Sequence, residues 1–165
     1  MKKTTFAVLC IMLGILAVAA VCLAVFVFNS HETFKRKIQV KIDGVTEETF
    51  SVKELELNPS GTKEYEIEFF CEAEGEFGVE LIYTEKRDGG MKNFVQVAVL
   101  SGGEVVYEGG LSALLDEGEK VSFDCTLASK EAAKIVIRYT MPAETGNEAQ
   151  NTSTAFDVTV KIRKK

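Results

Sequence analysis

Histidine is nearly absent from this sequence, which has a single one, at position 31. A zinc protease of the H-E-x-x-H type needs two imidazoles one helical turn apart, and the stretch from His31 to Lys35 supplies only the first. A Ser-His-Asp set would have to take its base from the linker that holds His31. The sequence therefore predicts no catalytic residues, no metal ligands and no cofactor, and we expect the protein not to be an enzyme.

The sequence also has no excess of basic over acidic residues. The chain has 19 basic and 25 acidic residues, and residues 31–165 hold 17 of the basic and all 25 acidic ones, which gives that part a net charge of −8. A surface this acidic repels phosphate backbones, so no nucleic-acid binding is predicted. The acidic stretches CEAEGEFGVE and DEGEK lack the D-x-D-x-D-G spacing of a calcium loop and indicate a solvated acidic face.

Charged residues are missing from Phe6 to Phe28, a run of 23 residues that follows Lys2 and Lys3. At about 1.5 Å per residue, such a helix is long enough to cross a hydrocarbon core about 30 Å thick. Residues 1–30 are either a membrane anchor, which the length of the apolar run favours, or a signal peptide cleaved near the Ala17-Val18-Ala19 stretch. We expect residues 31–165 to form one extracytoplasmic domain, membrane-anchored or secreted.

Long amphipathic helices are lacking as well, and alternating apolar residues take their place. The predicted strands are 38–42, 45–57, 65–71, 77–83, 95–99, 121–127, 135–141 and 156–162. Only Leu111 to Gly118 has a helical pattern. The sequence predicts an all-β fold: a two-sheet antiparallel sandwich of jelly-roll type with about eight strands, preceded by one N-terminal hydrophobic helix.

The polar segment between the last two predicted strands, PAETGNEAQNTST after Met141, is the most specific feature of the sequence. It resembles the penultimate-loop signature of the TasA/camelysin family of exported Gram-positive bacterial proteins, in which M/L-P is followed by G-N-x-x-Q-N/G. The matching positions are Pro142, Gly146, Asn147, Gln150 and Asn151. The upstream segments LNPSGTKEYEIEF and YEGGLSALLDEGEKVSF resemble family segments in the same order. A loop that only closes the sandwich, with Asn and Gln side chains bonding its unpaired backbone groups, is the other interpretation.

The resemblance implies a jelly-roll protein exported by the general secretory route, in a family that includes fibre-forming biofilm matrix proteins and others labelled metalloproteases. This sequence departs from the family in having VFVFNSHETF in place of an alanine-rich cleavage site, and it has no metalloprotease histidines. We therefore expect a non-enzymatic cell-surface or biofilm-matrix-type structural protein. The alternative is a membrane-anchored extracellular binding module.

Two further sets of residues bear on assembly and stability. Ile38, Val40 and Ile42 form an alternating strand that a neighbouring chain could capture, so the expected partners are a second copy, by strand donation, or another cell-surface protein. Cys71 and Cys125 both fall at positions of their predicted strands that face the core. They form a disulfide if their Cα atoms lie within about 7 Å, or they stay free as small apolar residues, and the sequence leaves both alternatives open.

Overall fold

The computed structural model describes residues 31–41, 43–128 and 131–165. The chain divides into two compact units, Met1–Glu32 and Thr33–Lys165, and the second contains the sandwich. The apolar segment from Phe6 to Phe28 and the residue Ile42 lie outside the described residues. Among the residues that are described, none belongs to a helix long and apolar enough to cross a membrane.

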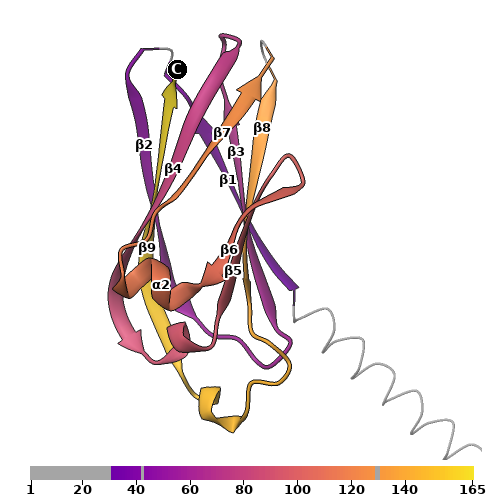
Figure 1. Cartoon of the computed structure of the whole chain (residues 1–165), viewed down its shortest axis with the longest axis vertical. Helices are drawn as coiled ribbons and strands as arrows, with labels where there is room; N and C mark the ends of the chain where they lie inside the picture. The colour runs from indigo at the N-terminus through magenta and orange to yellow at the C-terminus, as the bar shows by residue number, and fades with distance from the viewer. Residues whose placement is uncertain (1–30, 42, 129–130) are drawn as a thin grey trace, which may run out of the picture. The chain divides into compact units, whose positions relative to one another are not determined.

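Nine strands and three short helices make up the described part of the chain (Figure 1). The strands are β1 (His31–Gln39), β2 (Val45–Leu55), β3 (Thr62–Phe70), β4 (Gly75–Gly89), β5 (Gln96–Ser101), β6 (Glu104–Gly110), β7 (Val121–Leu127), β8 (Ala132–Thr140) and β9 (Ser153–Lys164). The helices are the 3-10 helix η1 (Met91–Asn93), the α-helix α2 (Leu111–Asp116) and the 3-10 helix η2 (Asn147–Ala149). The prediction of a mostly β chain with two sheets and one short α-helix in the body is confirmed.

The two sheets have the orders β1-β3-β8-β5-β6 and β2-β9-β4-β7. Without β1, each sheet has four strands, and the chain passes between the sheets in the order of a jelly roll. The pairs within these two sets are antiparallel. The N-terminal strand β1 is an addition at one edge of the larger sheet.

The strand β1 departs from the predicted antiparallel arrangement. Lys35 lies 3.3 Å from a carboxylate oxygen of Glu66, and the backbone N–H of Val40, just beyond β1, donates to the carbonyl of Phe70 at 2.9 Å. The contacts advance in the same direction along both strands, so β1 runs parallel to β3. Alternation predicts which side chains of a strand face the core, but it does not predict the direction of its neighbour.

The core lies between the two sheets and is formed by the residues of inward parity. On β4 these are Phe77, Val79, Leu81 and Tyr83, all buried. Rings from the two sheets meet in the middle, where the centroids of Tyr139 and Phe156 are 5.6 Å apart. The alternation therefore predicted the inner faces correctly for these strands.

One strand, β6, is not predicted by the alternation. Its residues Val105 and Val106 are adjacent and both exposed, at 57% and 38%. The pairing of β6 with β5 shifts register here, because Tyr107 lies opposite Val99 and Val105 lies opposite Leu100, which leaves Val106 as an extra residue that breaks the period of two. The sequence therefore predicts the first strand of the β5–β6 hairpin and the loop around Gly102 and Gly103, but not the second strand.

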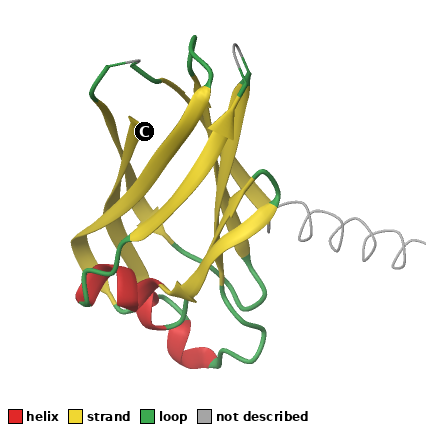
Figure 2. Cartoon of the chain, turned by 45° about the horizontal axis from the view of Figure 1, so that its top comes forward, coloured by secondary structure: helices red, strands yellow, loops and turns green. Residues whose placement is uncertain are grey.

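The three helices lie together at one end of the sandwich, as both views show (Figures 1 and 2). The segment 141–152, which contains η2, lies at the same end. Its start is fixed by the backbone N–H of Met141, which donates to Gly61 at 3.0 Å. Its end is fixed by the hydroxyl of Thr152, which donates to the Ala149 carbonyl at 2.7 Å.

Candidate functional site

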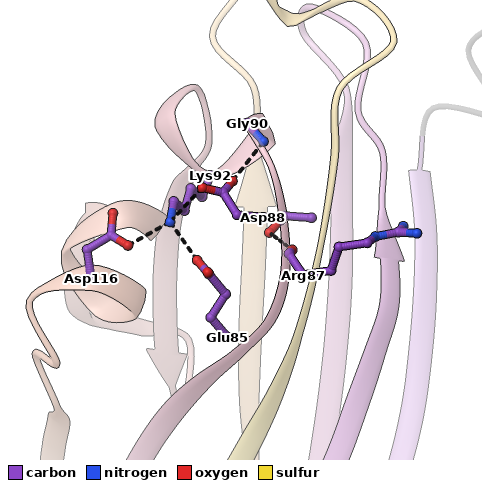
Figure 3. Close-up of polar contacts among 7 residues, drawn as sticks. Glu85, Arg87, Asp88, Gly90, Lys92 and Asp116 are labelled. Atoms are coloured by element: carbon purple, nitrogen blue, oxygen red, sulfur yellow. Dashed lines mark hydrogen bonds and ion pairs between the residues drawn. The ribbon is translucent and has the colours of Figure 1, made fainter.

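A buried lysine organises the helical end of the sandwich (Figure 3). The Nζ atom of Lys92, whose side chain is 8% exposed, lies 2.5 Å from Glu85, 3.0 Å from Asp88 and 2.6 Å from Asp116. Two of these carboxylates come from β4, and Asp116 ends α2. Lys92 itself lies in η1, so one ammonium joins three segments of the chain.

The charges of this cluster stabilise one another. Hydrogen bonds to Asp116 first and Glu85 second hold the pKa of Lys92 above its ordinary value, so it stays an ammonium at neutral pH. The backbone N–H of Gly90 donates to Asp88 at 2.8 Å, and this bond, followed by the Lys92 ammonium, lowers the pKa of Asp88. A lysine with a raised pKa is a poor base and a poor nucleophile, so the cluster acts as a scaffold.

No group of three or more His, Cys, Asp or Glu side chains is placed to hold a metal ion in the part of the chain that the structure describes. The carboxylates around Lys92 already have their cation. Sequence reasoning missed this cluster, because Asp116 is 24 residues from Lys92 along the chain and only the fold brings them together.

The five residues of the predicted signature loop lie in one connection, between β8 and β9. Gln150 donates from its side-chain nitrogen to the side-chain oxygen of Asn147 at 2.9 Å, and Asn151 has a left-handed backbone with φ 61°. Gly146 and Asn147 are exposed, and Pro142 is half-buried. The loop is held by short-range bonds of its own, both between backbone groups and between side chains. The side chain of Gln150 bonds to the side chain of Asn147, whereas we predicted a bond to the backbone.

The two cysteines of the sandwich are free thiols. Cys71 is buried just after β3, and Cys125 is half-buried on β7 with its Sγ 3.7 Å from the Phe77 carbonyl. Desolvation by burial, with a smaller contribution from Asp124, raises the pKa of the Cys125 thiol to about 11.

Two strand edges of the larger sheet are unpaired in the described part of the chain, that of β1 and that of β6. The β6 edge carries exposed Val105 and Val106 between Glu104 and Glu108. Neither glutamate has an ion-pair partner among the described residues. This edge lacks lysine and proline, the residues that commonly protect a strand edge from pairing.

The β1 edge has the opposite charge. Lys35, Arg36 and Lys37 are exposed and make ion pairs at 3.3, 3.7 and 3.3 Å with acidic residues of the same chain. The residues predicted to form a donated strand lie here: Ile38 and Val40 are each 4% exposed and are buried in the sandwich of their own chain. Ile42, the third of them, lies outside the described residues.

Comparison with known proteins gives no family. No protein-family model matches the sequence, and no curated protein is significantly similar to it. Among solved structures, the chain is similar to PliG, a periplasmic inhibitor of g-type lysozyme from Aeromonas hydrophila, with 13% identity over 81% of this chain and 99% of that one, and a TM-score of 0.40. The C-terminal CBM6 of LamC from Zobellia galactanivorans has 11% identity over 73% and 100% of the two chains, and a TM-score of 0.38. A similarity at this level does not extend to function.

Proposed function

We propose that this chain is a non-enzymatic structural protein of the cell surface or biofilm matrix, which assembles through the two unpaired edges of its five-stranded sheet. The observation that carries the proposal is that one sheet ends in two edges of opposite charge, basic on β1 and acidic with exposed valines on β6. The resemblance of residues 57–160 to the TasA/camelysin family supports it. The apolar segment 6–28 supports an extracytoplasmic location.

Pairing of β6 with β1 of the next copy would extend the sheet from molecule to molecule. The two surfaces differ, so the contact is head-to-tail and leaves a free edge at each end of the assembly. The backbone groups of both edges would be paired, and Val105 and Val106 would lose solvent exposure. Glu104 and Glu108 would gain the cationic partners that they lack among the described residues.

Strand donation is a second route to the same assembly. It requires Ile38 and Val40 to leave the core of their own chain, whereas edge pairing leaves every chain folded as it is. The double variant Lys37→Cys and Glu68→Cys distinguishes the routes, because these side chains face each other within one chain. Edge pairing gives a disulfide inside each monomer. Strand donation gives a covalent ladder on a non-reducing gel, and Lys37→Cys alone is the control.

Sedimentation velocity of the full chain in a mild detergent, over a range of protein concentrations, tests the proposal. We expect oligomers that dissociate with rising salt, and we expect the variant carrying Val105→Lys and Val106→Lys to stay monomeric. Both valines are exposed, so these changes leave the fold intact. Thr126→Lys adds a charge to β7, an edge of the other sheet, and should not affect assembly. A monomer at every concentration would contradict the proposal and favour an anchored binding module.

A further inference from the structure

The outer face of the four-stranded sheet has a groove of about 450 Å³ that the assembly edges of the other sheet do not use. Strands β7, β4, β9 and β2 all contribute to its lining. A volume of this size is within the range of small-molecule sites in proteins. The groove lies on a sheet face, so its floor is made of cross-strand neighbours.

Two rows of residues cross the groove. In the first row, Gly78 of β4 lies between Asp124 of β7 and Arg163 of β9. Gly78 has no side chain, and a Cβ built on it would lie 3.7 Å from the Asp124 Oδ1 and 3.9 Å from the Cε atom of Lys165, both at ordinary van der Waals distance. The middle of this row is therefore a shallow hollow, bordered by Asp124, the Lys165 side chain and Arg163.

In the second row, Glu80 of β4 lies between Ser122 of β7 and Lys161 of β9. Glu80 is 3.2 Å from Lys120, and Lys161 is 3.2 Å from Glu47 of β2. The charges of this row are therefore already paired. Ser122 is exposed and lines the groove.

Arg163 is the exception to the pairing. Its neighbours across the strands are Gly78 and Val45, neither of which is charged. Asp124, the carboxylate beyond the hollow, is taken by Lys165 at 2.5 Å. In the described part of the chain, Arg163 has no ion-pair partner, and it is exposed at the border of the hollow.

We propose that this groove binds a hexuronate unit of an acidic polysaccharide, with the sugar ring over Gly78. A guanidinium binds a carboxylate through two parallel hydrogen bonds, which fits the sugar's one carboxylate to Arg163. Oxygens of Glu80, Asp124 and Ser122 lie across the groove and accept hydrogen bonds from the sugar hydroxyls. A sugar has hydroxyl donors for these two carboxylates, whereas ionised Asp and Glu side chains have no donor, so the acid groups of the wall favour the sugar over an acidic peptide.

Titration calorimetry of the full chain in detergent, with trigalacturonate as the probe, tests the site. We expect weak binding that falls with salt and is reduced about tenfold or more by Arg163→Gln, because a charge-assisted pair is lost. Gly78→Val fills the hollow at a strand position with ordinary φ and should abolish binding while the protein stays folded. Arg87→Gln is the matched control, because Arg87 lies on β4 and is paired with Glu54, and it should leave binding within about twofold.

Maltotriose, which has no carboxylate, should not bind. Three results would each overturn the proposal: no heat with trigalacturonate at millimolar concentration, unchanged binding in both Arg163→Gln and Gly78→Val, or tighter binding of poly-glutamate than of the sugar. The last result would assign the groove to acidic peptides. The site is independent of the β1 and β6 edges, so its failure leaves the assembly proposal standing.

Discussion

The Lys92 ammonium lies 2.6 Å from the carboxylate of Asp116, at the point where α2 ends. The short helix has no side-chain cap at its N-terminus. Its attachment to the sandwich depends on this ion pair and on its buried residues Leu111 and Leu114. The helix follows β6 directly, so the cluster also fixes one end of a strand that we propose as an assembly edge.

Replacing Lys92 by Met should lower the free energy of unfolding by about 1–3 kcal/mol, measured by urea denaturation. The variant keeps the apolar stem but leaves the carboxylates of Glu85, Asp88 and Asp116 without their cation. Lys134→Met is the control, since Lys134 also pairs with a glutamate, Glu66 at 2.8 Å, but is half exposed. An equal loss in the two variants would contradict the role of burial.

The stability of the protein should fall in acid, in part through Asp88. The pKa of Asp88 is lowered in the folded state, so its contribution is present above the ordinary carboxyl pKa near 4 and is lost as the pH drops through the lower folded value. Asp88→Asn should be less stable than the natural protein at pH 7. Unfolding curves measured from pH 7 to pH 2 should converge at low pH, and a constant gap would contradict the assignment.

The inner faces of the sandwich could be predicted from the sequence, and its edges could not. Residues such as Phe77 and Phe156 alternate because one side of each strand is buried. The parallel direction of β1 depends on the path that the chain takes between β1 and β3, and the alternation of apolar residues carries no information about this path. The sequence did not predict the β6 edge, because Val105 and Val106 are both exposed and do not alternate with polar residues. It did not predict the groove either, because the space there depends on the absence of a side chain at Gly78, which has no signature in the sequence.

Two glycines of the helical end should respond in opposite ways to alanine. A Cβ on Gly89 would lie 2.2 Å from the carbonyl oxygen of Ser153 on the neighbouring strand, so Gly89→Ala should destabilise the protein by about 1–3 kcal/mol. Gly146, a residue of the signature loop, has φ −73° and open space around it. Gly146→Ala should be neutral or stabilising by about 0.5 kcal/mol in the same thermal or urea unfolding assay. A large loss of stability in Gly146→Ala would show that glycine is needed at this position for a reason other than its backbone conformation.

The thiols of Cys71 and Cys125 should be unreactive in the folded protein and free in the unfolded one. Burial raises the pKa of Cys125 to about 11, so the thiolate that reacts with iodoacetamide is about 100-fold scarcer at pH 8 than for an ordinary thiol, and labelling should slow in proportion. Cys71 is fully buried and should be protected by lack of access. In denaturant without a reducing agent, peptide-resolved mass spectrometry should find both residues alkylated. If both stay unlabelled there and become labelled only after reduction, both thiols are oxidised in the natural protein, and a disulfide-linked peptide that contains Cys71 and Cys125 would show that they are bonded to each other.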